Sequence, residues 1–247
     1  MNLLLLDVGN SRLKWAQSQG GTLRYGGAVE HGGDPAAALA AVDATDVDSI
    51  QVANVTGAAL AAPLAAALQS RFGVAPRFAR TEAEWAGLRV AYADPQRLGI
   101  DRWLALLAAW TEVRGPLCVA SAGTALTFDA VDASGRHLGG VIAPGLTTMQ
   151  QAVLGATRFA ASGPDQRYTE ELGDDTDSCV RQGALHACAG LVERLAARYG
   201  GSALLLLTGG DAARLLPHLC GGWSERPHLV MEGLLTLAPH TTAPDSG

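Results

Sequence analysis

Lysine and aromatic side chains are scarce in this sequence. Of its 18 Lys and Arg residues only Lys14 is a lysine, and Phe, Trp and Tyr together make up 5% of the 247 residues. No run of basic residues offsets the formal net charge of −6. Binding to nucleic acid or to anionic lipid usually leaves a basic patch in a sequence, and none is present here. We therefore expect neither a nucleic-acid partner nor a membrane partner.

Disulfide and zinc frameworks are absent from the sequence as well. The four cysteines form no C-x-x-C pair, and no histidines stand at zinc-ligand spacing. This pattern predicts reduced thiols. The apolar run Leu3–Leu6 ends at Asp7 with no basic residue before it, so it predicts neither a signal peptide nor a membrane span. We expect a cytoplasmic protein.

Several common catalytic signatures are also missing. The sequence contains no G-x-x-x-x-G-K-[ST], G-x-G-x-x-G, H-E-x-x-H, G-x-S-x-G or protein-kinase H-R-D motif. P-loop NTPases, Rossmann dehydrogenases, zincins and α/β-hydrolases therefore have no support. What is present is an ordinary globular composition with 48% apolar residues, long enough for one large domain or two small ones.

The order of predicted elements indicates an α/β fold. Helices between strands imply parallel crossovers, and the layout βββ-α-β-α-β of the first half restarts after about half of the chain. In the first half we expect strands at Leu3–Val8, Arg12–Ser18, Leu23–Glu30, Ile50–Val55 and Val74–Phe78, and helices at Pro35–Val42 and Ala58–Phe72. In the second half we expect strands at Leu117–Ser121, Leu126–Val131, His137–Ile142, Ala203–Leu207 and His228–Met231, and helices at Leu146–Leu154, Gly183–Tyr199 and Ala212–Leu219.

The two halves can be laid over each other, which indicates an internal duplication. A shift of 114 residues aligns two turns, with Asp7 on Ser121, Gly9 on Gly123 and Asn10 on Thr124. We expect two similar domains, 1–115 and 116–237, facing each other across a central cleft. A helix at Trp103–Val113 is apolar nearly all round and is expected to be buried between them. The Pro-, Thr- and Ser-containing tail, 238–247, is expected to be disordered.

The first turn has the chemistry of a phosphate-binding loop. Asp7 stands at the end of a buried strand, where a carboxylate needs a partner, and Gly9 lets backbone approach a ligand. Turn amides suit phosphate oxygens, and a carboxylate suits Mg²⁺. Lys14, after the turn, can point its ammonium back towards a phosphate. An Asp-capped turn with Lys14 on a solvated face is the alternative reading.

The second turn, Ser121–Thr127, has the same character. Small residues leave its backbone amides accessible, and Thr124 adds a hydroxyl. Alone it is equally a plain hairpin turn. Two such turns facing one cleft would hold a polyphosphate from two sides, and phosphoryl transfer is catalysed largely by such positioning.

A third candidate lies between the halves. Asp101 follows Gly99 in the first turn of the apolar helix, where negative charge is favoured. Asp101 can accept the proton of an attacking hydroxyl, and Arg102 can hold an anion. A solvated Asp with a pKa of about 3.9 is a weak base, so it would mainly orient the hydroxyl. A helix-capping Asp with an ion-paired Arg is the alternative.

Four segments, in this order along the chain, resemble the motif set of type III pantothenate kinases: Asp7–Ser11, Gly99–Arg102, Ala122–Ala125 and Gly139–Gly145. The resemblance covers nearly the whole chain. It implies the acetate/sugar-kinase, Hsp70 and actin superfamily fold, with two duplicated ribonuclease-H-like (actin-like ATPase) domains. It also implies ATP-dependent phosphorylation of pantothenate to 4′-phosphopantothenate, the first step of coenzyme A biosynthesis. Members of this family are homodimers with the acceptor pocket at the subunit interface.

The resemblance also implies roles for individual residues. Asp101 would be the proton acceptor, and Asp7 would hold Mg²⁺ through the ATP phosphates. ATP would be bound by Asp7, Val8, Gly9, Asn10, Ser11, Arg12, Leu13, Lys14 and Thr124. Pantothenate would be bound by Tyr92, Gly99, Ile100, Asp101, Arg102 and Thr176. Ser11 replaces the more usual Thr, and Ser121 stands where many members carry an Asp that helps to bind a monovalent cation, K⁺ or NH₄⁺.

Two other functions remain open from the sequence. One is a kinase of another small hydroxylated acceptor on the same fold, because the phosphate loops would look the same. The other is a non-enzymatic transcription accessory factor of the Baf type. The presence of Asp7, Asp101 and Thr124 argues against a lost active site, and the acidic pI argues against direct DNA binding.

Overall fold

The computed structural model describes residues 1–156 and 167–238, which form two compact units. The first unit contains residues 1–82, 96–108 and 229–238, and the second contains residues 83–95 and the described part of 109–228. Among the described residues, no helix is both long and apolar enough to cross a bilayer.

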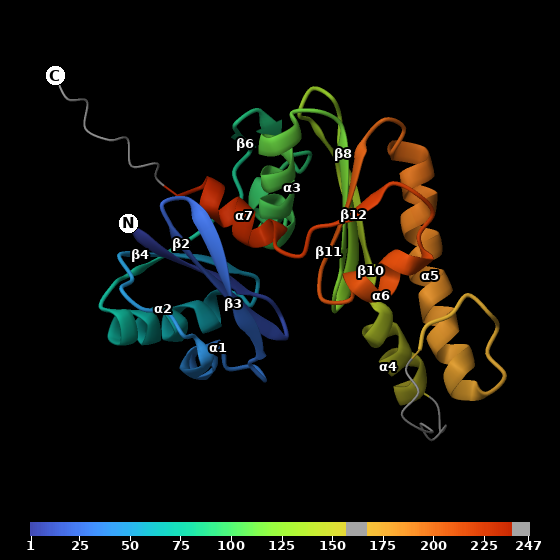
Figure 1. Cartoon of the computed structure of the whole chain (residues 1–247), viewed down its shortest axis with the longest axis horizontal. Helices are drawn as coiled ribbons and strands as arrows, with labels where there is room; N and C mark the ends of the chain where they lie inside the picture. The colour runs from blue at the N-terminus through green and yellow to red at the C-terminus, as the bar shows by residue number, and fades with distance from the viewer. Residues whose placement is uncertain (157–166, 239–247) are drawn as a thin grey trace. The chain divides into compact units, whose positions relative to one another are not determined.

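The first unit is built on a five-stranded mixed sheet in the order β3-β2-β1-β4-β5 (Figure 1). Its strands are β1 (Asn2–Val8), β2 (Arg12–Gln19), β3 (Thr22–Glu30), β4 (Ser49–Asn54) and β5 (Pro76–Phe78). The first three strands form an antiparallel meander, whereas β4 pairs parallel with β1 and β5 pairs parallel with β4. Tight turns suffice for the meander, and the parallel pairs need the longer crossovers that the sequence predicted.

Helices cover both faces of this sheet. Helix α1 (Pro35–Ala38), the 3₁₀ turn η1 (Leu39–Ala41) and α2 (Ala58–Phe72) pack on one face. The core on that face contains Leu4, Leu6, Val8, Leu13, Leu39, Leu64 and Leu68. Because side chains alternate along a strand, Asp7 points to the opposite face. Helix α7 (Leu229–Thr236) also packs against β1, β2 and β4.

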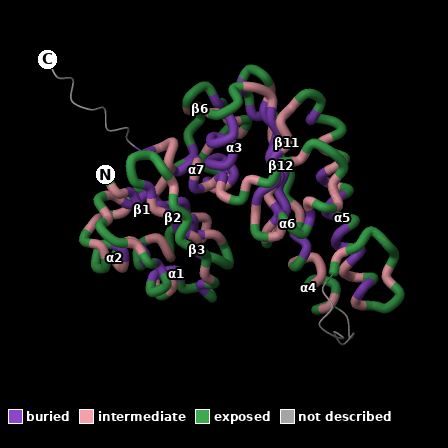
Figure 2. The backbone as a smooth tube through the Cα atoms, in the orientation of Figure 1, coloured by how far each residue is buried: buried purple, intermediate pink, exposed green. Residues whose placement is uncertain are grey.

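Helix α3 (Ile100–Val113) begins in the first unit and packs tightly against α7 there. A Cβ atom on Gly233 of α7 would lie 2.3 Å from the Leu104 carbonyl oxygen of α3, so only glycine allows the two backbones to approach this closely. Trp103 is fully buried. The tube in Figure 2 is buried through much of β1 and α3, whereas the edge strand β3 is mostly exposed.

The second unit repeats the first sheet in the order β10-β9-β8-β11-β12. Its strands are β8 (Leu117–Ala122), β9 (Ala125–Val131), β10 (His137–Pro144), β11 (Leu204–Thr208) and β12 (Trp223–Glu225). Strand directions also repeat: β8, β9 and β10 form an antiparallel meander, and β11 and β12 run parallel to β8. A small hairpin of β6 (Glu84–Trp85) and β7 (Leu88–Arg89), which the sequence did not predict, belongs to the same unit.

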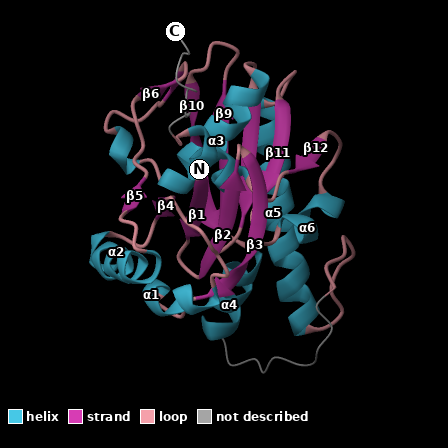
Figure 3. Ribbon diagram, turned by 60° about the vertical axis from the view of Figure 1, so that its left-hand side comes forward, coloured by secondary structure: helices cyan, strands magenta, loops and turns pink. Residues whose placement is uncertain are grey.

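Helices α4 (Leu146–Ala156), α5 (Thr176–Tyr199) and α6 (Ala212–Leu215) complete the second unit. Figure 3 shows α5 and α6 beside the strands of this unit, and their buried side chains share one core with Cys118, Phe128 and Leu207. The 3₁₀ turns η2 (Pro95–Arg97) and η3 (Leu216–His218) lie before α3 and after α6.

The identical order and direction of strands confirm the duplicated α/β architecture. The predicted shift of 114 residues maps the last residue of β1 onto that of β8, and the last residue of β3 onto that of β10. The first hairpin loop has three residues, Gly9–Ser11, and the second has two, Gly123–Thr124. The alignment of Asn10 with Thr124 therefore needs correction: hydrogen bonding makes Ser11 the counterpart of Thr124, as described below.

Two predicted elements differ most from the structure. His228–Met231 was predicted to be a strand, but helix α7 begins at Leu229, and the last strand is β12. The periodicity of a short apolar run does not show whether the run forms a strand or a helix. Here the segment forms a helix that packs against the first sheet. The helix predicted at Gly183–Tyr199 begins earlier, at Thr176, where Asp175 and Ser178 form a capping box. The predicted tail, apart from Ala238, lies outside the described residues.

Candidate active site

Asp7 is a buried charged residue of the first unit. It lies in β1 directly opposite Lys14 of β2, and 3.7 Å separates Oδ2 of Asp7 from Nζ of Lys14. The Asp7 side chain is only 10% exposed, and burial raises its pKa to about 6 despite the opposing effect of Lys14. The charge of Asp101 raises the pKa of Asp7 further. A carboxylate held at this energetic disadvantage is a candidate functional group rather than a stabilising one.

Asp101 therefore lies close enough to Asp7 for electrostatic coupling, although the chain separates the two residues widely. Asp101 occupies the first turn of α3, where the helix dipole favours its negative charge. The Trp103 amide donates to the Gly99 carbonyl at 3.0 Å, which closes this first turn. The structure thus brings three predicted site residues, Asp7, Lys14 and Asp101, into one charged group within the first unit.

Gly99 sets the position of the Asp101 carboxylate. A Cβ atom built on Gly99 would lie 2.7 Å from Oδ1 of Asp101, closer than real Cβ contacts allow. The backbone of Gly99 does not have the positive φ that excludes other residues. An alanine there would therefore leave the backbone intact and displace the carboxylate.

We expect Gly99→Ala to reduce kcat for the phosphoryl transfer that the sequence predicts by about 10²-fold, with little loss of stability. A displacement of about 1 Å at a reacting group has an effect of this size. Steady-state kinetics and thermal unfolding of the same preparation measure the two effects. Gly190→Ala on α5 is the matched control, since a Cβ there meets nothing within 4 Å. A Gly99→Ala enzyme with unchanged kcat would show that Asp101 does not need this position.

The second hairpin loop contains Thr124, the predicted ATP-binding residue that lies outside the segment Asp7–Lys14. Its carbonyl oxygen accepts hydrogen bonds from the Gly145 amide at 3.0 Å and from the Thr148 hydroxyl at 2.6 Å. A Cβ on Gly145 would lie 1.8 Å from the Gly123 carbonyl oxygen, so this position requires glycine. The start of α4 is thus pressed against the loop and holds it in one conformation.

Ser121 lies at the centre of a row of hydroxyl-bearing residues. On β8 it is directly opposite Thr127 of β9 and Thr208 of β11. Directly opposed residues on neighbouring strands share a face of the sheet. The row in the second sheet occupies the positions that Lys14, Asp7 and Ala53 occupy in the first.

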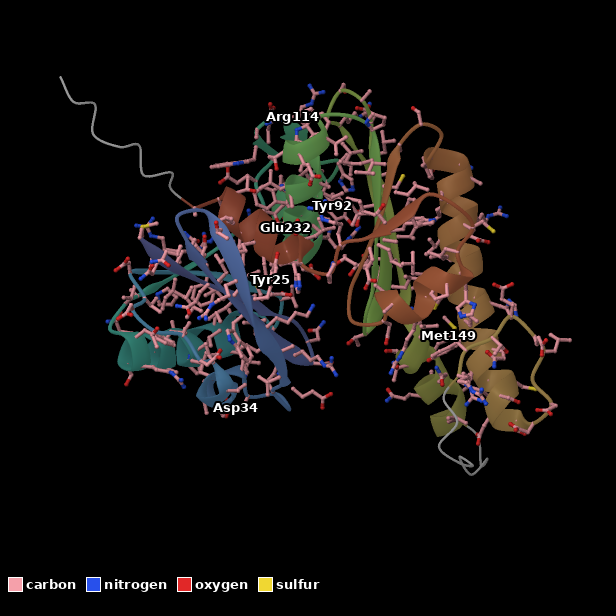
Figure 4. The ribbon with its side chains drawn as sticks, in the orientation of Figure 1. Tyr25, Asp34, Tyr92, Arg114, Met149 and Glu232 are labelled. Atoms are coloured by element: carbon pink, nitrogen blue, oxygen red, sulfur yellow. The ribbon has the colours of Figure 1, made fainter. Side chains whose placement is uncertain are left out.

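Tyr92 stacks on a buried histidine–aspartate pair of the second unit. Its ring is 6.2 Å from that of His137, with 16° between their planes, and Nε2 of His137 is 2.9 Å from Oδ1 of Asp129. His137 is fully buried and Asp129 is 2% exposed. The Ala91 amide donates to Nδ1 of His137 at 3.4 Å, so Nε2 carries the hydrogen that is donated to Asp129. Tyr92, labelled in Figure 4, therefore packs against the hydrogen-bonded pair of His137 and Asp129.

Thr176 begins α5 at the edge of a cavity in the second unit. The cavity has a volume of about 660 Å³ and is lined by α4, including Met149 (Figure 4), and by the first turns of α5. Its lining also includes the acidic pair Asp174 and Asp175. No group of three or more His, Cys, Asp or Glu side chains in 1–156 and 167–238 is arranged to hold a metal ion by itself.

Comparison with known proteins decides the family. The family model described as type III pantothenate kinase matches residues 3–198. The type III pantothenate kinase of Xanthomonas oryzae pv. oryzae is 42% identical over 251 residues, covering 99% of this chain and 100% of that protein. The type III pantothenate kinase of Nitrosococcus oceani is 35% identical over 252 residues, covering 97% of this chain and 95% of that protein. The chain belongs to the type III pantothenate kinase family.

Solved structures agree with this family's fold. A conserved putative Baf family transcriptional activator from Campylobacter jejuni aligns with a TM-score of 0.60 at 19% identity, over 94% of this chain and 96% of that chain. A putative N-acetylmannosamine kinase from Listeria monocytogenes aligns with a TM-score of 0.50 at 14% identity, over 96% of this chain and 98% of that chain. At these identities the likeness shows the fold alone, the α/β architecture of actin-like ATPases and related sugar kinases.

Sequence reasoning on this pantothenate kinase family member missed three polar residues beside the predicted site. They are His31 near the first loop and the buried pair of Asp129 and His137 behind Tyr92. One signal for His31 was present, since the shift of 114 residues places it on Gly145 of a recognised motif. An acidic residue inside the mostly apolar strand β9 was the corresponding signal for Asp129.

Proposed function

We propose that this protein phosphorylates pantothenate with ATP to give 4′-phosphopantothenate, the first step of coenzyme A biosynthesis. Membership of the type III pantothenate kinase family supports the reaction and the acceptor. The single structural observation that carries the proposal is the group of Asp7, Lys14 and Asp101, with Asp7 buried and its pKa raised to about 6. A buried carboxylate beside a lysine and a second carboxylate suits metal-assisted phosphoryl transfer.

The first hairpin loop is proposed to bind the ATP phosphates together with Thr124 of the second. The proposed ATP-binding residues are Asp7, Val8, Gly9, Asn10, Ser11, Arg12, Leu13, Lys14 and Thr124. Asp7 fits Mg²⁺, because that ion takes one or two protein carboxylates and fills its remaining positions with phosphate oxygens and water. Bound Mg²⁺ would neutralise charge on the phosphates. Lys14 is proposed to attract the same anionic groups, which its position 3.7 Å from Asp7 supports.

Asp101 is proposed to orient the acceptor hydroxyl and to take its proton. In the first turn of α3 its charge is favoured by the helix dipole, and the nearby Asp7 carboxylate repels it. The Asp101 charge in turn raises the pKa of Asp7. The neighbouring Arg102 is buried, with 7% exposure, and is proposed to hold the pantothenate carboxylate.

The remaining acceptor-binding residues are proposed from the family pattern: Tyr92, Gly99, Ile100 and Thr176. We also propose that the protein is a cytoplasmic homodimer with its acceptor pocket at the subunit interface. Residues 1–115 and 116–237 are the proposed ribonuclease-H-like domains, each containing one of the two five-stranded sheets.

A monovalent cation, K⁺ or NH₄⁺, is proposed to bind near Ser121. The row of Thr127, Ser121 and Thr208 offers hydroxyl oxygens, but no carboxylate lies in it. A neutral hydroxyl attracts a cation less strongly than a carboxylate does.

We expect Ser121→Asp to lower the K⁺ concentration that gives half-maximal activity, roughly tenfold, since adding one charge near a cation contributes about 1 kcal/mol or more. Initial rates over a K⁺ series at constant ionic strength measure this. Ser134→Asp, on the exposed turn after β9, is the control. An unchanged K⁺ response in Ser121→Asp would place the cation elsewhere.

A comparison of acceptors tests the proposed function. Pantothenate and its alcohol analogue pantothenol carry the same reacting hydroxyl, but only pantothenate has a carboxylate. We expect the wild type to phosphorylate pantothenate with a far higher kcat/KM than pantothenol. Arg102→Met should lower the kcat/KM for pantothenate to the value for pantothenol. Equal turnover of both acceptors by the wild type would contradict carboxylate recognition, and turnover of neither would contradict the proposed acceptor.

A further inference from the structure

His31 is a buried histidine between β3 and α1 with no role in the reaction proposed above. It is 7% exposed. Gly32 and Gly33 follow it with φ angles of 55° and 93°, a left-handed conformation that glycine adopts without strain. Asp34 then caps α1 by accepting from the Ala37 amide at 3.0 Å (Figure 4). This tight turn brings the imidazole back over the first hairpin loop.

Two backbone groups fix the tautomer of His31. The Gly33 amide donates to Nδ1 at 3.1 Å, so Nδ1 carries no hydrogen. The other ring nitrogen, Nε2, lies 2.9 Å from the Gly9 carbonyl oxygen, which can only accept. Neutral His31 with its hydrogen on Nε2 satisfies both contacts, and the ring therefore donates to the loop.

The main chain of His31 holds the same loop at a second point. Its amide donates to the Ser11 carbonyl oxygen at 3.1 Å. His31 thus fixes the carbonyl groups of Gly9 and Ser11, which flank Asn10. The described peptide bonds are all trans, and in a trans peptide the carbonyl and the next amide hydrogen point in opposite directions. With the Gly9 carbonyl turned towards His31, the Asn10 amide hydrogen points away from His31.

The second unit holds its own loop from the equivalent position. The shift of 114 residues maps His31 onto Gly145, and the Gly145 amide donates to Thr124 just as that of His31 donates to Ser11. Gly145 approaches the Gly123 carbonyl so closely that no side chain fits. The carbonyl of Gly9, the counterpart of Gly123, is contacted by the His31 ring instead. Both copies of the fold therefore hold the second loop carbonyl through a backbone amide at the equivalent position, and the first copy adds the contact of the His31 ring with the Gly9 carbonyl.

We propose that His31 is a positioning residue for the phosphate loop Gly9–Ser11. His31 holds the Gly9 and Ser11 carbonyls towards itself, so that the Asn10 amide points away from His31 and is presented to a nucleotide phosphate. The inference rests on the proposed assignment of this loop to ATP. Backbone amides fixed in advance bind an anion without the entropic loss of ordering a free loop. The ring itself touches no substrate, so its effect falls on nucleotide affinity.

Nucleotide affinity of His31 variants tests the proposal. His31→Leu removes the ring donor, and His31→Gln keeps a donor amide near the position of Nε2. We measure the Kd of Mg-ADP by calorimetry, and the KM values for ATP and pantothenate with kcat. His186→Gln, an exposed histidine of α5, is the matched control. Thermal unfolding of each variant shows whether it is folded.

We expect His31→Leu to raise the Kd of Mg-ADP and the KM for ATP about tenfold, the effect of losing one partly buried hydrogen bond. The KM for pantothenate should stay within twofold, and His31→Gln should recover most of the affinity. Unchanged Mg-ADP affinity in folded His31→Leu would overturn the proposal. Equal increases in both KM values, without rescue by glutamine, would also overturn it, because they indicate a general structural role.

The direct binding measurement separates this inference from the proposed reaction. If the wild type binds Mg-ADP but does not phosphorylate pantothenate, the proposed function fails while the His31 comparison still decides the inference. If the wild type binds no nucleotide at all, the loop is not a phosphate loop and the inference is overturned with it.

Discussion

Replacing Asp7 by asparagine is expected to abolish phosphoryl transfer and at the same time to stabilise the folded protein at neutral pH. Burial raises the pKa of Asp7 to about 6 from its ordinary 3.8. The folded protein therefore binds this proton more tightly than the unfolded chain does. The contribution of this proton to stability is fully present below pH 3.8, falls as the pH rises from 3.8 to about 6, and is lost above about 6. Asparagine removes the ionisation.

The expected gain in unfolding free energy above pH 6 is about 3 kcal/mol, since each pKa unit corresponds to about 1.36 kcal/mol. Urea unfolding of wild type and Asp7→Asn between pH 3.5 and pH 8 measures it. The difference between the two proteins should grow from pH 3.8 to pH 6 and then stay constant. Asp46→Asn, on an exposed turn that asparagine tolerates, is the control and should change neither stability nor activity.

Loss of activity in Asp7→Asn should come with weakened Mg-ATP binding, because a neutral amide is a poor ligand for Mg²⁺. Titration with Mg-ADP separates this effect from a loss of turnover alone. An Asp7→Asn protein that is less stable than the wild type at pH 8 would show that Asp7 is a structural ion-pair partner of Lys14. Retained activity would remove Asp7 from the site.

Asp101→Asn is expected to reduce kcat by about 10²–10⁴-fold, the range that a positioned general base contributes. Asparagine keeps the size of the side chain but does not take up a proton. The KM for ATP should change little, because Asp101 is not among the proposed ATP-binding residues. Stopped assays for 4′-phosphopantothenate measure the rate, with Asp46→Asn again as control.

A second effect of Asp101→Asn reports on the geometry of the site. The Asp101 charge raises the pKa of Asp7, so its removal should lower the pKa of Asp7 towards the ordinary value. Carboxyl carbon NMR over a pH series measures this shift directly. A large fall in kcat with an unchanged Asp7 pKa would contradict the coupling between the two carboxylates.

The sequence predicts the sheets well because their signals are local. The meander strands are separated by glycine-containing turns, and the repeat after 114 residues supplies a second copy of the same pattern. The strand predicted at His228–Met231 was wrong because Leu229–Met231 is apolar throughout and too short to show a periodicity. Its contacts with β1, β2 and β4, far away in sequence, select the helix.

The charged group of the site could be predicted only in part. Asp7 and Lys14 meet because hairpin register places them directly opposite each other, and the tight turn between them was visible. The proximity of Asp101 depends on where α3 packs, which no local pattern encodes. The raised pKa of Asp7 follows from burial by elements distant in sequence, and the support of Tyr92 by His137 likewise joins separate segments.

The most direct test of the central claim is incubation of the purified wild-type protein with pantothenate, Mg²⁺ and ATP, with the products identified by mass spectrometry. We predict one 4′-phosphopantothenate for each ADP formed, and no product when pantothenate is omitted. ADP formed without phosphorylated pantothenate, or no ADP at all in folded protein supplied with K⁺ or NH₄⁺, would contradict the assignment of this site to pantothenate phosphorylation.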